Sequence, residues 1–311
     1  LYYLMEVNIL YYKIEDGFKE QSSLEGYTGD VVTIITEKEL KSKLASKEID
    51  SKFVPNYKNA KCCRADVHKG CFSLTFSVVS KDKKRNRLNF GCIVKKDNVI
   101  FIDDSGIVKT CIKKMQKNKI SESTTLERFL YDFLETLIDS DLRYMEEMGD
   151  RLTRIESAVV KGILDDFNKN MIDFRKEALM FYRYYTQLSD IGQEFQENEN
   201  GFFSDKAVNL FGMFTIRADR LREEAHILRD YSSQVRDIYH SQTDAKQNKI
   251  MKVLTVVTTV LMPISILSAW YGMNFDTMPE LHWSYGYIAF IIASILTTFG
   301  SVWYLKKKKF W

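Results

Sequence analysis

Two long uncharged runs near the carboxyl end constrain this chain more than any other feature. Residues 253–275 contain 23 residues without a charge, and residues 284–305 contain another 22. Each run exceeds the roughly 20 residues that a helix needs to cross a hydrocarbon core about 30 Å thick. Two buried core helices are the alternative, but soluble cores seldom place two such runs side by side at a chain end. The sequence therefore predicts a pair of transmembrane helices, 253–275 and 284–305, joined by an outer loop at 276–283.

The residues that flank the two runs predict how the pair is oriented. Lysines stand on one side only, at Lys249 and Lys252 before the first run and at Lys306, Lys307, Lys308 and Lys309 in the tail 306–311, whereas the loop has no Lys or Arg. By the positive-inside rule both ends of the chain then face the cytoplasm. No secretory signal is expected, because acidic residues interrupt the apolar stretch at the amino end. We expect a multi-pass protein of the plasma or inner membrane, with the lipid bilayer as a partner.

Residues 1–120 have the pattern of a cytoplasmic α/β domain. The β-branched run at 30–36 precedes a helical segment, and 71–80, 87–96 and 98–104 are typical of a strand meander. The basic loop "KDKKRNR" at 81–87 is more typical of a solvated hairpin tip than of a nucleic-acid site. No Gly-rich phosphate loop and no Ser/His/Asp set is present, so we predict neither an enzyme nor a nucleic-acid partner.

All five cysteines lie in this domain, which the predicted topology places in a reducing compartment, so disulfides are not expected. Cys62, Cys63, His68 and Cys71 could be drawn as a zinc cluster. Adjacent cysteines, however, do not form the CxxC knuckle of structural zinc sites. We therefore favour ordinary buried thiols over a metal site.

The pattern becomes helical in the region 121–203. Apolar spacings of three and four predict one helix from Thr125 to near Gly162 and a second from about 165 to 191. Acidic residues recur on both: Asp139, Asp141, Glu146, Glu147, Asp150, Asp165 and Asp166. A solvated face is the ordinary interpretation, and a regulatory surface for divalent ions is the alternative.

A long stalk helix is predicted at 204–252. Between Gly212 and Pro263 there is neither Gly nor Pro, so one helix can run from the stalk into the first membrane span. One face of that helix carries Asp237, Ser241, Asp244, Asn248, Met251, Leu254, Thr258, Met262 and Ser265, at steps of three and four that average 3.5 residues. Along this stripe the chemistry changes from carboxylates and an amide to Met and Leu and then to hydroxyls. Helix packing would explain such spacing, and so would a pore lining.

The carboxyl-terminal motifs resemble those of the CorA-type magnesium transporters. Tyr271, Gly272, Met273 and Asn274, followed by "MPEL" at 278–281, are similar to that family's Gly-Met-Asn signature and outer loop. "MKVLT" at 251–255 and the closing lysines fit the same family. So does the predicted fold class, an α+β cytoplasmic domain with a long stalk helix and two carboxyl-terminal transmembrane helices.

The resemblance implies a funnel-shaped homopentamer with a central pore for passive, potential-driven influx of Mg²⁺, with Co²⁺ or Ni²⁺ as substitutes. It also implies closure by intracellular divalent ions, so that Mg²⁺ would be both transported and regulatory. By family position, the selectivity filter is Tyr271, Gly272, Met273 and Asn274, with Asn274 and Gly272 holding the hydrated ion. The remaining roles are implied as follows: pore and gate, Asn248, Met251, Leu254, Thr258, Met262 and Ser265; cytoplasmic mouth, Asp237 and Asp244, with Asp237 also a metal ligand; cation attraction in the outer loop, Asp276 and Glu280; inner basic ring, Lys306, Lys307, Lys308 and Lys309.

One position departs from the family pattern, and two rival functions stay open. Met213 stands where related proteins carry an inhibitory-site carboxylate, and Asp205 and Asp219 are out of register. A zinc or other transition-metal transporter of the same fold would need softer ligands near the mouth, where only His282 and Met273 are candidates. A membrane-anchored coiled-coil scaffold without a pore would leave the Gly-Met-Asn tripeptide without a role.

Overall fold

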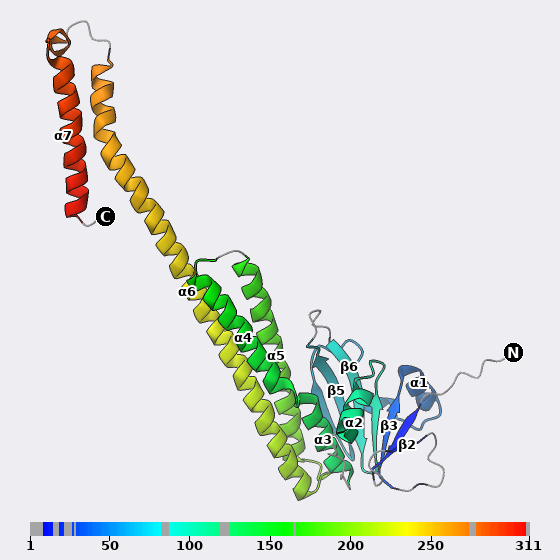
Figure 1. The fold of residues 1–311 in the computed structure, drawn as a ribbon. Coiled ribbons are helices and arrows are strands. Elements are labelled where there is room, and N and C mark those ends of the chain that lie inside the picture. Colours follow the sequence, from blue (N-terminus) through cyan, green and yellow to red (C-terminus); the bar gives the residue numbers. More distant parts are fainter. Residues whose placement is uncertain are drawn as a thin grey trace. The chain divides into compact units, whose positions relative to one another are not determined.

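The computed structural model describes residues 9–14, 19–21, 27, 29–81, 87–117, 125–163, 166–273 and 278–308, with the backbone alone at 280 and 281 (Figure 1). The chain forms two compact units. The first comprises Leu1–Ser157 with Asp165–Val235, and the second comprises Ala158–Leu164 with Arg236–Trp311. The basic loop at 82–86, Asp165, Asn274, Asp276 and Lys309 lie outside the described residues.

A seven-stranded mixed sheet forms the centre of the first unit, in the order β2-β1-β3-β7-β6-β5-β4. Its strands are β1 Leu10–Lys13, β2 Lys19–Gln21, β3 Val31–Ile35, β4 Arg64–His68, β5 Cys71–Val79, β6 Arg87–Lys95 and β7 Asn98–Ile102. Among the described strands, only the β3–β7 pair is parallel. Every residue of β3 is buried, as expected for a β-branched strand that is covered on both faces. The sequence prediction of β3, β5, β6 and β7 is confirmed, whereas β1, β2 and β4 were not predicted.

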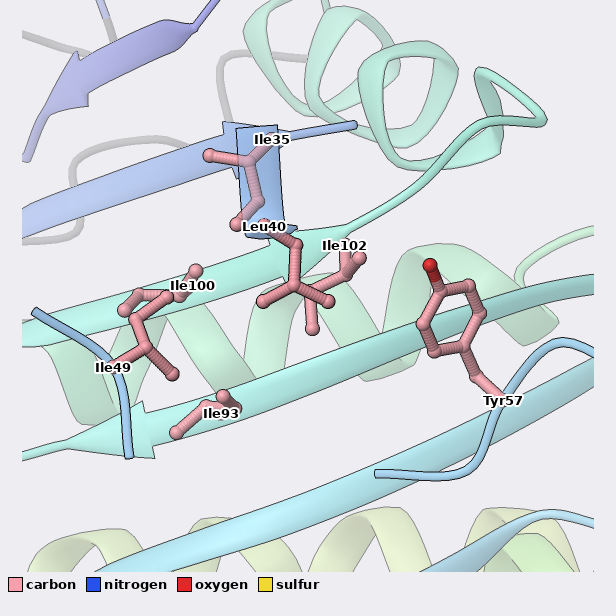
Figure 2. Packing of buried hydrophobic residues seen from close by; sticks show 7 residues of the cluster. All are labelled: Ile35, Leu40, Ile49, Tyr57, Ile93, Ile100 and Ile102. Atoms are coloured by element: carbon pink, nitrogen blue, oxygen red, sulfur yellow. The ribbon is translucent and has the colours of Figure 1, made fainter. Parts of the chain in front are cut away.

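One face of the sheet is covered by α1 (Glu37–Ala45) and the segment that follows it, which includes the short helix η1 (Ser51–Phe53). Ile93, Ile100 and Ile102 project from β6 and β7 toward Leu40 of α1 and Tyr57 (Figure 2). The seven side chains of this cluster are at most 6% exposed. Burying one Ile or Leu side chain contributes about 1.5–3 kcal/mol, so the cluster holds α1 firmly on the sheet.

The opposite face of the sheet packs against helices through aromatic rings. Phe90 and Phe101 meet Phe133 of α3 (Leu126–Ile138), with ring centroids 6.0 Å and 4.7 Å apart. Phe72 of β5 packs on Phe195 of α5 (Phe167–Glu197) at 5.2 Å. The helix α2 (Ile107–Lys117) buries four side chains in the same unit. The sheet is thus an inner layer, and its helical face anchors the elements that lead to the stalk.

The helix predicted from Thr125 to near Gly162 is two helices, α3 and α4 (Asp141–Val160). The break comes at 139–140, and a buried polar cluster accounts for it. Asp141 is 2% exposed, accepts a hydrogen bond from the Tyr185 hydroxyl at 3.0 Å and is paired with Lys81, which also donates to Ser140 Oγ at 2.6 Å. Because a buried carboxylate needs such partners, the chain turns here to bring Asp141 to them.

The long helix α6 (Asp205–Tyr271) confirms the prediction that one helix runs through Pro263. Within the first unit, α4 and α5 lie along its amino-terminal part (Figure 1). Its apolar face there is fully covered: Phe211, Phe214, Ala218, Leu221 and Leu228 are each at most 8% exposed. Ser189 of α5 adds a hydrogen bond to Asp219 at 2.7 Å.

The second unit contains the rest of α6, the short helix η2 (Pro279–His282) and α7 (Gly286–Lys307). Its two long helices lie side by side (Figure 1), and the Tyr271 ring meets Phe290 of α7 edge-on at 5.4 Å. Both α6 and α7 are long and apolar enough to cross a membrane by length and composition, and almost no residue of their apolar windows is fully buried in the single chain.

Candidate functional site

The predicted stripe forms an exposed face of α6 within the second unit. Met251, Leu254 and Met262 are 58%, 55% and 64% exposed, and Thr258 and Ser265 are exposed as well. Each helical residue turns by about 100°, so these five positions fall within an arc of about 80°. From Met251 to Ser265 the stripe extends about 21 Å along the helix. Apolar side chains this exposed in a single chain are free to contact other copies of the chain or to line a pore.

The opposite face of the same helix turns toward α7. Val256, Val260, Ile264 and Leu267 are half-buried, and Tyr271 packs on Phe290. At about 100° per residue, the centre of these half-buried positions lies about 165° from the centre of the stripe. The helix α7 therefore covers the back of the stripe and leaves its front uncovered.

The hydroxyls of the stripe keep oxygen lone pairs free. Thr258 Oγ1 donates to the carbonyl oxygens of Leu254 at 2.8 Å and Thr255 at 3.1 Å, and Ser265 Oγ donates to Leu261 at 3.0 Å. A hydroxyl has one donor and two acceptor positions, so donation into the helix leaves the acceptors pointing outward. Such oxygens can accept hydrogen bonds from the water shell of a cation.

The Gly-Met-Asn tripeptide begins at the carboxyl end of α6. Gly272 N–H donates to Ser268 O at 3.0 Å, and Met273 N–H donates to Trp270 O at 3.3 Å, which closes the last turn. A Cβ added at Gly272 would lie 3.2 Å from Ser268 O, tighter than most such contacts. The carboxyl end of a helix carries a partial negative charge of about half an electron, which favours a nearby cation. Asn274 follows this end but lies outside the described residues, as does Asp276.

The amino-terminal end of the stripe is polar and exposed. Asp237, Asp244 and Asn248 are all exposed, and Arg236 Nε lies 3.8 Å from an Asp237 carboxylate oxygen. This pair is loose and solvated, so it contributes little to stability and leaves Asp237 available to a cation.

The lysines of the predicted basic ring are exposed at 306–308, and Lys307 Nζ lies 5.1 Å from the centroid of the Trp303 ring. In η2, His282 Nδ1 is 3.4 Å from the Met278 carbonyl oxygen. The side chain of Glu280 is not among those described.

The alternative metal sites of the sequence do not assemble. Within the described ranges no group of three or more His, Cys, Asp or Glu side chains could hold a metal ion. Cys62 is exposed, whereas Cys63 and Cys71 are buried. Burial raises the pKa of Cys63 to about 12, and its thiol donates toward the Ser77 carbonyl oxygen at 3.8 Å, as in an ordinary core thiol. His68 packs edge-on against Phe53 at 5.1 Å.

The acidic residues singled out in the helical region 121–203 divide into two kinds. Asp139, Glu146, Glu147, Asp150 and Asp166 are exposed. Asp141, in contrast, is the buried partner of Lys81, and burial raises the pKa of its carboxyl. On the stalk helix, Met213, the position that departs from the family pattern, is 52% exposed.

The out-of-register carboxylates of the stalk are placed differently. The Asp219 carboxylate accepts a hydrogen bond from Ser189 Oγ and lies 3.1 Å from a guanidinium nitrogen of Arg222. Asp205, in contrast, is exposed in the first turn of α6.

The sequence did not predict which α7 residues support the stripe. Phe290 and Trp283, together with Gly286, line a cavity beside Tyr271 and Gly272. Which of these residues faces α6 depends on how the two helices pack.

Comparison with known proteins gives a consistent result. The model of the family described as "CorA-like Mg2+ transporter protein" matches residues 48–307. The "Cobalt/magnesium transport protein CorA" of Thermotoga maritima is 25% identical over 180 residues, which cover 58% of this chain and 51% of that protein. The "Magnesium transport protein CorA" of Helicobacter pylori is 31% identical over 211 residues, which cover 59% of this chain and 64% of that protein. The matches thus span between about half and two thirds of these relatives.

The fold has a close counterpart among solved structures. The complete structure of the CorA magnesium transporter from Methanocaldococcus jannaschii superposes with a TM-score of 0.82, covering 97% of this chain and 98% of that one at 16% identity. At this identity the likeness concerns the fold. It includes the α+β domain, the long helix and the two apolar helices at the carboxyl end.

Proposed function

The chain belongs to the CorA-like Mg²⁺ transporter family, and from that premise we propose that it conducts Mg²⁺ through a central pore lined by the stripe on α6. Five copies surround the pore, with the α6 helices inside and the α7 helices outside. Influx is passive and driven by the membrane potential, with Co²⁺ and Ni²⁺ as substitute ions. Both chain ends lie in the cytoplasm, in keeping with the lysines at 249, 252 and 306–309.

The observation that carries this proposal is the position of the stripe relative to α7. Met251, Leu254 and Met262 are more than half exposed, although the other side of the same helix is covered. An apolar face that merely met lipid would not need the ordered change from Asp237 and Asn248 through Met and Leu to hydroxyls. In a ring of five helices this face surrounds the axis.

The outer end suits an ion that keeps its water. Mg²⁺ dehydrates reluctantly and is commonly held through several retained waters. Neutral oxygens from Asn274, together with backbone carbonyls near Gly272, accept hydrogen bonds from such an ion without trapping it. Five helix carboxyl ends, each with about half a negative charge, attract the ion to the same place. The carboxylates of Asp276 and Glu280 raise the cation concentration further out.

The inner part of the stripe suits a gate. Rings of Met251, Leu254 and Met262 expel water when they are narrow, and a dewetted pore blocks an ion that cannot shed its shell. Thr258 and Ser265 supply hydroxyl rings that keep the wider parts hydrated. Asp237 and Asp244 then receive the ion at the cytoplasmic mouth, outside the repulsive ring of lysines at 306–309.

Closure by intracellular divalent ions is part of the proposal, and Mg²⁺ is then a regulatory as well as a transported ion. Because Met213 offers no oxygen ligand, the closing ions bind at carboxylates elsewhere on the cytoplasmic domain. We assign no residue to that site.

A flux assay with several ions tests the proposed function. Purified chain in liposomes, with an inside-negative potential, should admit Mg²⁺, and Asn274→Ala should abolish this influx. A transition-metal transporter of the same fold would pass Zn²⁺ but not Mg²⁺. A scaffold without a pore would show no flux, or a flux that Asn274→Ala leaves unchanged.

A further inference from the structure

A cavity of about 510 Å³ lies between the outer ends of α6 and α7. Aromatic rings of Tyr271, Trp283 and Tyr287 form its walls, and Ser268 and Ser284 add hydroxyls. None of the described lining side chains carries a charge. Aromatic side chains of this kind gather at the depth of the lipid headgroups, where one end of the ring is apolar and the other is wet.

An apolar groove of about 360 Å³ adjoins this cavity, since Phe290 lines both. It is walled by Ile264 of α6 and by residues of α7 from Phe290 to Phe299. The two hydroxyls in it point into their own helix: Ser294 Oγ donates to Phe290 O at 2.9 Å, and Thr298 Oγ1 donates to Ser294 O at 2.7 Å. The groove therefore presents almost no unsatisfied donor to an occupant.

The length of the groove matches one leaflet. From Phe290 to Phe299 the helix rises by about 14 Å. Half of a hydrocarbon core about 30 Å thick is about 15 Å. The cavity stands at the end of the spans where α6 and α7 are connected, and the groove runs from it toward the middle of the membrane. Together they have the form of a headgroup site followed by an acyl-chain site.

We propose that a phospholipid of the outer leaflet occupies this site, with its glycerol and headgroup region in the cavity and one acyl chain in the groove. The groove is continuous with the exposed apolar surface of α7, which includes Ile292 and Leu296 and faces lipid in a membrane-spanning helix. A lipid fits this surface better than a polar solute, because the groove offers no charge and no free donor. Van der Waals contact along the groove then holds the acyl chain in place.

The site touches the proposed filter from behind. Tyr271 and Gly272 line the cavity, and they are the first residues of the signature that ends α6. A bound lipid packs against the side of Tyr271 that faces away from the stripe. The lipid therefore supports the last turn of α6 at the outer end of the pore. This link to the filter rests on the proposed function, whereas the lipid site itself does not.

Photolabelling of the full-length chain tests the site directly. The probe is a phosphatidylcholine with a diazirine midway along one acyl chain, incorporated into phosphatidylcholine vesicles that contain the protein. Adducts located by mass spectrometry should be severalfold more frequent on groove residues such as Ile291 and Ile295 than on Ile292 and Leu296, which lie at similar depth outside it. Equal labelling of both sets would overturn the proposal, because it would mean annular lipid only.

Matched variants and a protein crosslink complete the test. Ser294→Phe fills the groove and should reduce its adducts severalfold, whereas Leu296→Phe, outside the groove, should not. A photoreactive residue at 294 that crosslinks to a second copy of the chain instead of to lipid would also refute the proposal. None of these readouts requires ion flux, so the lipid site and Mg²⁺ transport can fail separately.

Discussion

Two glycine substitutions test the packing that holds the stalk helix. Gly192 lies in α5 against α6: a Cβ there would overlap Thr215 Oγ1 and lie 3.1 Å from Phe214 Cδ1. Thr215 is buried, and its hydroxyl donates to Phe211 O at 2.9 Å, so it cannot move away freely. Gly149 in α4 is the matched position, since a Cβ there would meet Leu228 Cδ2 at an ordinary 3.7 Å.

The two changes should have opposite signs. Replacing Gly by Ala inside a helix stabilises by about 0.8–1.0 kcal/mol. Gly149→Ala should therefore stabilise the protein by about that amount. Overpacking a close contact costs about 1–3 kcal/mol, so Gly192→Ala should lower the free energy of unfolding by up to about 2 kcal/mol after the helix term is subtracted. A change of 1 kcal/mol moves the melting temperature of a domain of this size by about 2–4 °C.

Thermal unfolding of the full-length chain in detergent, followed by circular dichroism, measures both shifts. Gly192→Ala should melt lower than wild type and Gly149→Ala higher. Combining Gly192→Ala with Thr215→Ala removes the overlapping oxygen, and the two changes should then be less damaging together than their sum. If Gly192→Ala raises the melting temperature as Gly149→Ala does, Gly192 of α5 does not lie as close to Thr215 of α6 as described.

Three further predictions concern other parts of the chain. A water-soluble maleimide at neutral pH should label only Cys62 quickly, because Cys63 is buried with its pKa raised to about 12; rapid labelling of Cys63 well below that pH would contradict its burial. Burial raises the pKa of Asp141 above its usual 3.8, so its contribution to stability is full below that pH and declines as pH rises through the raised value; Asp141→Asn should remove this decline from a plot of melting temperature against pH. Leu254→Asn should hydrate the gate and raise basal Mg²⁺ leak in liposomes, whereas Val253→Asn, on the other side of α6, should not; equal leak in both would argue against a gate at Leu254.

Sequence patterns predicted the parts of the fold whose signal is local. The buried run at 31–35, the apolar lengths of the two spans and the absence of Gly and Pro between Gly212 and Pro263 each produce the expected element. The break between α3 and α4 was missed because its cause is not local. Asp141 is paired with Lys81, which follows the end of β5, and with Tyr185 of α5, and both residues are distant from it in sequence.

For the candidate site, too, the sequence predicted only what a local pattern determines. A 3.5-residue spacing is sufficient to place Met251, Leu254 and Met262 on one face, but it does not tell which face α7 covers. That depends on the pairing of Tyr271 with Phe290, and these residues are joined only through the connection between α6 and α7. The cavity and groove beside them come from the same pairing, and no pattern within either helix alone indicates them.

Modification of single cysteines along α6 during Mg²⁺ influx tests the central claim most directly. In a Cys62→Ser background, Ser265→Cys places a thiol on the stripe, and Leu267→Cys places one on the half-buried α7 side of the same turn. A positively charged thiol reagent should stop Mg²⁺ entry into liposomes through Ser265→Cys and leave Leu267→Cys conducting. Equal block of both variants, or block of neither, would contradict a pore lined by this face of α6.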